Sequence, residues 1–299
     1  MAQEPRFTVV IPTYNSSGHA AAAIASVVAA ADGRSHEVLL VDDHSDDRQM
    51  LAAIAERHGT VRIIDKPERT NAAHSRNLGF EAARAAVVFF LDSDDLFSPG
   101  HVARRLALHD GGHGVIFGAF ELTMAGKSER RHHRYDGQDM AEYIFAQGAD
   151  VRSSTISIDR RAHRGALFDP ELAKHQDWAF AITAQAQGES IGYDQEPGVV
   201  IQAGGGHRMS TRSDVAAGEA FLRRYLTAPS ARIGFLMGRL KASLKLGDEM
   251  AAGRFLTLLR AERPGGVVMI RARALMWAEK LGLVPLLSQS ARMLRRLRG

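Results

Sequence analysis

The stretch that decides the fold is residues 87–95, VVFFLDSDD, in which five apolar residues run directly into three carboxylates within four positions. An apolar run of this composition is typical of a strand that is buried on both faces of a sheet. Its carboxylates then fall at the carboxyl end of the strand, where open α/β sheets bind ligands. Clustered carboxylates repel one another, and a divalent cation such as Mg²⁺ or Mn²⁺ relieves that repulsion. An acidic turn or a helix cap is the alternative for such a motif in isolation.

Two upstream segments repeat the pattern of a buried strand that ends in polar residues. Residues 37–45, EVLLVDDHS, end in a carboxylate pair, and residues 7–15, FTVVIPTYN, pass from an apolar run into a polar loop. Because proline cannot donate to a sheet ladder, we expect the first strand to end at Ile11, directly before Pro12.

The ends of these three strands bring polar side chains together if the strands are parallel neighbours. Tyr14 and Asn15 follow the first strand, Asp43 follows the second, and Asp92 and Asp94 follow the third. An aromatic face, a carboxylate that accepts a hydrogen bond from a nucleobase, and a metal site for a diphosphate together predict a nucleotide pocket.

The remaining pattern predicts an α/β fold followed by helices. We expect residues 7–110 to alternate strands and helices around a parallel sheet, with a strand at 61–64 and helices at 17–31, 48–58, 71–86 and 100–109. The second half is expected to hold strands at 115–124, 153–158 and 199–202, a polar connector at 126–135, and helices at 139–147 and 177–187. Residues 214–299 are expected to form several short helices, the last two at 267–281 and 286–297.

Composition and charge exclude some classes of site and suggest a partner. The 299 residues contain no cysteine, which excludes disulfides and thiolate metal sites and fits a cytoplasmic location. We identify no secretion signal and no run of about eighteen apolar residues that would span a membrane. Residues 229–299 carry 14 Arg or Lys and 4 Asp or Glu, a net charge of +10, which leaves 24 basic and 30 acidic residues, a net charge of −6, in residues 1–228. This asymmetry indicates an anionic surface as a partner.

Four segments resemble the family 2 inverting glycosyltransferases, which have the GT-A fold. They are VVIPTYN at 9–15, EVLLVDDHSDD at 37–47, NAAHSRNLGFEAARAAVVFFLDSDD at 71–95 and KHQDW at 174–178. The resemblance implies a Rossmann-like, mixed and mostly parallel sheet flanked by helices over residues 1–212, with a nucleotide-binding part at 1–110 and an acceptor part at 111–212. Residues 213–299 are not covered by it and form a basic, amphipathic helical extension in this reading.

The resemblance also implies roles for the acidic motif. Asp94 is expected to bind Mn²⁺ or Mg²⁺ directly, and Asp92 to contact the ribose or to support the metal through water. Asp95 is expected to support the motif from behind or to cap a helix.

A second set of implied roles concerns the nucleotide. Asp43 is expected to accept from the ring N–H of a pyrimidine, Tyr14 to cover the base, and Pro12 to fix the loop that also contains Asn15. Arg76 is expected to reach a phosphate or the base, because a guanidinium is a natural partner of phosphate oxygens. A surface ion pair is the alternative for Arg76.

Inversion at a sugar carbon requires one general base on the acceptor side. The resemblance assigns this role to Asp177 in the segment HQDW, although many family members have Glu where this chain has Gln176. A helix N-cap is the alternative for Asp177. Trp178 is either a platform for a sugar or a core residue.

The loop GGGHRMS at 204–210 is a further candidate. Its glycines permit close backbone approach to a phosphate, and His207 is expected to complete the metal shell. A flexible connection before the C-terminal helices is the alternative.

The C-terminal helices alternate basic residues with apolar ones and include a tryptophan. Helices of this kind lie in the interface of an anionic bilayer, so we expect peripheral contact with the inner face of the cell membrane. Packing of their apolar face against the catalytic domain is the alternative, and sparse aromatic residues argue against nucleic acid.

Taken together, the sequence predicts an inverting, metal-dependent glycosyltransferase. It is expected to move a sugar from a nucleotide sugar, with a UDP-sugar favoured, to a hydroxyl of a glycan or glycolipid in cell-surface polysaccharide synthesis. One alternative is a sugar-nucleotide nucleotidyltransferase, although VIPTYNSS at 10–17 lacks the glycine-rich, basic loop expected of one. The other is a non-catalytic, membrane-associated relative.

Overall fold

The structure is a computed structural model that describes residues 4–203 and 214–280, and the chain divides into two compact units. Unit 1 comprises residues 1–140 and 149–205, and unit 2 comprises residues 141–148 and 206–299. The expected domain boundary between residues 212 and 213 lies outside the described residues and stays a prediction.

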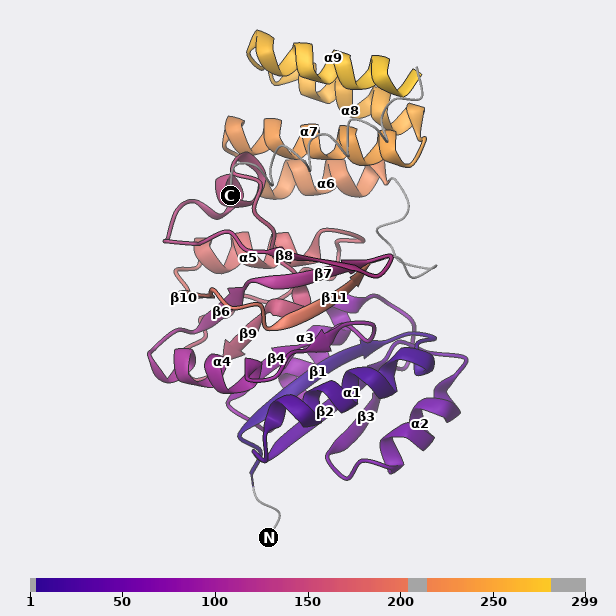
Figure 1. Cartoon of the computed structure of the whole chain (residues 1–299), viewed down its shortest axis with the longest axis vertical. Helices are drawn as coiled ribbons and strands as arrows, with labels where there is room; N and C mark the ends of the chain where they lie inside the picture. The colour runs from indigo at the N-terminus through magenta and orange to yellow at the C-terminus, as the bar shows by residue number, and fades with distance from the viewer. Residues whose placement is uncertain (1–3, 204–213, 281–299) are drawn as a thin grey trace. The chain divides into compact units, whose positions relative to one another are not determined.

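Unit 1 is built on a sheet of seven strands (Figure 1). Their order across the sheet is β10 (Ile191–Asp194), β6 (Val115–Gly118), β9 (Ser157–Asp159), β4 (Val87–Phe90), β1 (Phe7–Thr13), β2 (His36–Asp42) and β3 (Val61–Asp65). Strand β9 is antiparallel to both of its neighbours, and the other neighbouring pairs are parallel. The predicted mixed and mostly parallel sheet is therefore confirmed.

Helices cover both faces of this sheet. Helices α1 (Ser17–Ala31) and α4 (His101–Asp110) share one core with alternate residues of β1, among them Val9 and Ile11. Helix α3 (Ala72–Ala82) covers the other face, where a Cβ on Gly79 would lie 2.3 Å from Cγ1 of Val10. Helix α5 (Gln176–Ala186) packs on that same face through a chain of rings from Phe180 to Phe168 to Phe90. Helix α2 (Arg48–Glu56) lies against α1 and β3.

The prediction for Pro12 was wrong, because β1 continues through Pro12 to Thr13. The Val10 oxygen accepts from Leu91 N on the side of β4, and the Thr13 oxygen accepts from Asp43 N on the side of β2. Since neighbouring residues of a strand alternate in direction, the missing N–H of Pro12 falls on the β4 side, where β4 has already ended. The ladder with β2 therefore loses nothing at the proline.

A second sheet of four strands has the order β5 (Leu96–Phe97), β11 (Val199–Ala203), β7 (Phe120–Met124) and β8 (Lys127–Arg131). The single strand predicted at 115–124 was wrong: it breaks after Gly118 into β6 and β7, which belong to different sheets. The prediction of a polar connector at 126–135 was also wrong, because residues 127–131 form strand β8. Ala125 and Gly126 both have positive φ, which closes β7 and β8 into a two-residue hairpin.

The described part of unit 2 contains a π-helical turn, η1 (Glu142–Ala146), and the helices α6 (Val215–Tyr225), α7 (Pro229–Lys245), α8 (Glu249–Ala261) and α9 (Gly266–Lys280). Figure 1 shows these helices as a stack with α9, in yellow, at its end. The Phe145 ring contacts Phe221 and Phe235, and a Cβ on Gly234 would lie 2.1 Å from the Phe145 oxygen. Only a glycine permits this approach of η1 to α7.

Some other predictions differ in extent. The helix predicted at 139–147 is reduced to η1, and the strand predicted at 153–158 begins as a 3₁₀ turn, η2 (Ser153–Thr155), before β9. The helix predicted at 286–297 lies outside the described residues. Over residues 4–203 and 214–280, no helix combines the length and the apolar character needed to cross a bilayer.

Candidate active site

Three neighbouring parallel strands deliver the predicted side chains to one edge of the sheet. Tyr14 follows β1, Asp43 follows β2 and Asp92 follows β4, and β1 pairs with both of the other strands. The structure therefore brings these residues together as their positions at strand ends predicted.

The acidic motif after β4 divides into residues with different tasks. Asp92 is partly exposed and accepts from Arg76 Nη2 at 2.5 Å. Asp95 is buried, and its carboxylate accepts from Ser154 Oγ at 2.6 Å and from Gln202 N at 3.2 Å. Asp95 thus ties the motif to η2 and β11, in line with a supporting role. Asp94 is partly exposed.

Asp92 and Asp94 fit a cation that a bound substrate helps to hold. Within the described parts of the chain, no three His, Asp or Glu side chains converge in a geometry that would hold a metal alone. Mg²⁺ and similar ions are often held by one or two carboxylates, with phosphate oxygens and waters as the remaining ligands. Asp94 with Asp92 is a donor set of that kind.

Asp43 lies in a buried ionic cluster that sequence reasoning missed. Its Oδ1 accepts from Lys66 Nζ at 2.5 Å and from Thr70 N at 2.7 Å. The Lys66 side chain is fully buried and also contacts Thr70 Oγ1 and Ser75 Oγ. Lys66 directly follows β3, so its place at a fourth strand end was the available signal.

The loop after β1 combines an exposed ring with a strained backbone. Tyr14 is 39% exposed, and the Arg69 guanidinium lies over its ring at 3.8 Å from the centroid. Asn15 has a φ of 48° and holds the neighbouring loop, accepting from Asp46 N at 2.8 Å while its own N donates to Ser45 Oγ. Asn15 therefore ties the loop after β1 to the loop after β2.

Arg76 connects the two halves of the site. The side chain is buried on α3, donates through Nη2 to Asp92, and donates through Nη1 to Gln176 Oε1 at 3.2 Å. Its Nε has no hydrogen-bond partner among the described residues. The surface ion pair considered for Arg76 is therefore wrong, because this guanidinium is buried between the acidic motif and the start of α5.

Asp177 lies in the first turn of α5, next to two charged residues of opposite sign. Burial raises the pKa of Asp177 to about 6, Arg152 and Arg76 lower it, and Asp150 raises it. Asp150 accepts from Trp178 Nε1 at 3.1 Å and pairs with Arg152 at 2.7 Å. A carboxylate with this pKa is largely ionised at neutral pH and is a competent proton acceptor.

Trp178 is half-buried, and the His175 ring stacks on it at 4.7 Å with an interplanar angle of 6°. His175 has a φ of 68°, and His44, beside Asp43, has a φ of 66°. Strained residues of this kind gather at functional sites. His207 lies outside the described residues, so its predicted place in the metal shell stays a prediction.

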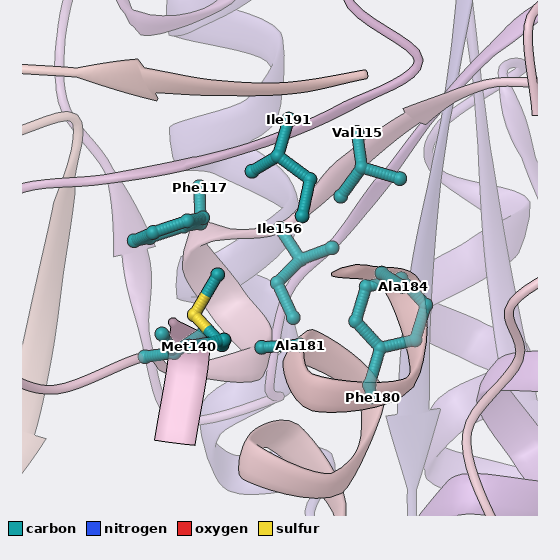
Figure 2. Close-up of a pocket in the computed structure, with 9 residues that line it drawn as sticks. Val115, Phe117, Met140, Ile156, Phe180, Ala181, Ala184 and Ile191 are labelled. Carbon is teal, nitrogen blue, oxygen red and sulfur yellow. The ribbon is translucent and has the colours of Figure 1, made fainter. Parts of the chain in front are cut away.

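A small cavity behind α5 is a packing gap and not a ligand site (Figure 2). Its volume is about 10 Å³, comparable to one water molecule. Only apolar side chains line it: Val115, Phe117, Met140, Val151, Ile156, Phe180, Ala181, Ala184 and Ile191.

Comparison with known proteins adds a family and a fold. The chain matches the family model "Glycosyl transferase family 2" over residues 8–174. It is 29% identical over 206 residues to the amylovoran biosynthesis glycosyltransferase AmsB of Erwinia amylovora. The matched region covers 61% of this chain and 64% of AmsB. The chain thus spans less than two thirds of that relative.

Two solved structures are similar in fold at low sequence identity. One is Staphylococcus aureus TarS 1–349 in complex with UDP-GlcNAc, with a TM-score of 0.60 at 15% identity over 93% of this chain and 92% of TarS. The other is the mannosyltransferase PcManGT of Pyrobaculum calidifontis in complex with GDP-Man and Mn²⁺, with a TM-score of 0.55 at 17% identity over 94% of this chain and 84% of that one. The predicted GT-A fold is confirmed.

Proposed function

Since the chain belongs to glycosyl transferase family 2, we propose that it transfers a sugar, with inversion, from a nucleotide sugar to a hydroxyl of a glycan or lipid-linked acceptor. The observation that carries the proposal is the continuous link from Asp92 through Arg76 and Gln176 to Asp177. It joins the acidic motif after β4 to a carboxylate whose pKa is raised to about 6. One site then holds both the donor diphosphate and the group that activates the acceptor.

In the proposed reaction, Asp177 takes the proton of the acceptor hydroxyl, and the oxygen of that hydroxyl attacks the anomeric carbon of the sugar. The bond from that carbon to the diphosphate breaks, and the nucleoside diphosphate leaves with the bonding electrons. Arg76 lies beside Asp92 and offers its guanidinium to the diphosphate, which stabilises the charge that develops there. A divalent cation, when bound at Asp94, neutralises further charge on the same diphosphate.

We propose a UDP-sugar as the donor. Asp43 presents a carboxylate at the strand end, with Oδ1 fixed by Lys66 and Thr70, so that Oδ2 accepts from the ring N–H of a uracil. Tyr14 and the Arg69 guanidinium over it supply a flat surface for that base. The UDP-GlcNAc bound by TarS supports this choice, and the GDP-Man bound by PcManGT makes GDP the nucleotide to test beside it.

The acceptor is proposed to be a growing cell-surface polysaccharide or its lipid-linked precursor, with the enzyme peripheral at the inner face of the membrane. The name of AmsB, an amylovoran biosynthesis glycosyltransferase, supports a polysaccharide product. The net charge of +10 over residues 229–299 supports contact with an anionic surface.

Calorimetry with UDP, GDP, CDP and dTDP, each with and without Mn²⁺, tests the donor site. We expect one nucleotide, UDP, to bind tightly only in the presence of Mn²⁺, and we expect this binding to vanish in Asp94→Asn. Asp177→Asn is the matched control, because it should bind UDP like the wild type and yet transfer no sugar. Absence of binding by every nucleotide to folded protein would refute the proposal, and full-rate transfer by Asp177→Asn would refute the assignment of the base.

A further inference from the structure

Helix α9 presents an apolar stripe to solvent. Val267, Ile270 and Trp277 are 64%, 68% and 67% exposed, and Ala274 between them is also exposed. At about 100° per residue, these four side chains fall within an arc of about 80° on one side of the helix. Among the described side chains of α9, the buried Ala272 lies on the opposite side and the buried Ala278 about 20° beyond Val267, and the helix contacts α7 and α8. The stripe is therefore additional to the face that holds α9 in unit 2.

An arginine flanks this stripe on each side. In the same helical projection, Arg273 lies about 40° beyond Trp277, and Arg271 lies about 40° beyond Val267. Both arginines are exposed, and no described residue forms an ion pair with either of them. In contrast, Arg232 and Arg254 of the same unit are paired with Glu262 and Glu219.

We propose that the exposed face of α9 is a docking surface for an anionic lipid bilayer. An apolar stripe with a tryptophan, bordered on both sides by cations, fits the boundary between acyl chains and acidic headgroups. The apolar side chains enter the acyl boundary, and the arginines extend outward to the headgroup phosphates. Because the stripe runs along the helix from Val267 to Trp277, burial of the stripe in the acyl boundary sets α9 parallel to the membrane surface.

The charge of the chain favours this occupant over another copy of the protein. Residues 281–299, which follow α9 in the sequence, contain four arginines and no acidic residue. A second copy would bring its own arginines against Arg271 and Arg273, and like charges repel. An anionic membrane instead attracts all of these residues. The inference deepens the membrane contact proposed above and does not depend on glycosyl transfer.

Co-sedimentation of the full chain with vesicles tests this surface. Vesicles of phosphatidylcholine with phosphatidylglycerol are compared with vesicles of phosphatidylcholine alone, without donor or metal. We expect binding to the anionic vesicles only, weakened about tenfold by Arg271→Glu and by Trp277→Ala. Arg57→Glu, an exposed arginine of unit 1, and Met250→Ala, 88% exposed on α8, are the matched controls and should bind like the wild type.

Several results would overturn the proposal. One is wild-type protein that stays in solution with both kinds of vesicle, and another is equal loss of binding in the α9 variants and in their controls. Light scattering supplies a third: a wild-type dimer that becomes a monomer in Trp277→Ala would identify a second copy as the occupant. Circular dichroism of each variant checks that the helices persist, and UDP binding, measured separately, shows whether the donor site is intact.

Discussion

Asp177 lies near two charges of opposite sign, Arg152 and Asp150. Removing each charge should move the low-pH limb of the pH–rate profile, where transfer falls as Asp177 is protonated, in opposite directions. Arg152 lowers the pKa of Asp177 and Asp150 raises it. Arg152→Met removes the cation, so the pKa should rise. Asp150→Asn removes the anion, so the pKa should fall, and the new amide oxygen still accepts from Trp178 Nε1 as Asp150 does at 3.1 Å.

The size of the effect follows from the pKa of about 6. A base with this pKa is about 90% ionised at pH 7 and about 10% ionised at pH 5, so kcat/KM of the wild type should fall about tenfold between them. The Arg152 side chain is 39% exposed, so solvent screens its charge, and we take the low end of the usual effect, about one unit. In Arg152→Met, Asp177 should then be about half ionised at pH 7, whereas Asp150→Asn should keep about half of its plateau activity at pH 5.

The assay is kcat/KM against pH, measured as release of nucleoside diphosphate at saturating metal. Plateau rates at high pH separate a shift in pKa from a loss of geometry. If kcat/KM of both variants fell at the same pH as that of the wild type, or if both falls moved in the same direction along the pH axis, Asp177 would not be the titrating group. The assignment of the base would then fail.

Three further predictions concern stability and binding. The pKa of Asp177 is raised in the folded state from 3.8 to about 6, so ionisation of this carboxyl opposes folding above about pH 4. Asp177→Asn should therefore raise the free energy of unfolding by about 1 to 3 kcal/mol near pH 8 and by little near pH 4. Urea titration at the two pH values measures this difference. Lys66→Met should leave Asp43 buried without its cation, lower the free energy of unfolding by about 3 kcal/mol and weaken UDP binding, with Lys66→Arg recovering part of both; unchanged urea midpoints would contradict this. Gly79→Ala should force a methyl against Val10 and lower the free energy of unfolding by about 1 to 3 kcal/mol, and a wild-type melting temperature would show that α3 shifts away freely.

The strand ends of the candidate site could be predicted because their signals are local. An apolar run followed by carboxylates specifies a buried strand and the chemistry at its end, and β2 and β4 both follow this rule. The adjacency of these strands on either side of β1 is the usual outcome of alternating strands and helices.

Other features depend on partners that a local pattern does not contain. Pro12 belongs to β1 because β4 ends early, and only the register of the sheet reveals this. Strand β8, KSERR, looks like a polar loop because it is an exposed hairpin arm with no buried face. Lys66 looks like a surface residue until Asp43, Thr70 and Ser75 surround it. The raised pKa of Asp177 likewise comes from tertiary burial.

The short excursion of residues 141–148 into unit 2 has a consequence for how such proteins recombine. The chain passes from unit 1 to unit 2, returns at residue 149, and leaves again near residue 205. The aromatic contacts of Phe145 with Phe221 and Phe235 therefore join segments that a single genetic crossover would separate. A chimera that exchanged only the C-terminal helices would place foreign residues at positions 221 and 235 against Phe145. It would also place a foreign residue at position 234, where a Cβ would meet the Phe145 oxygen. The two segments are thus expected to be inherited together, and a functional graft of the C-terminal helices must carry residues 141–148 with it.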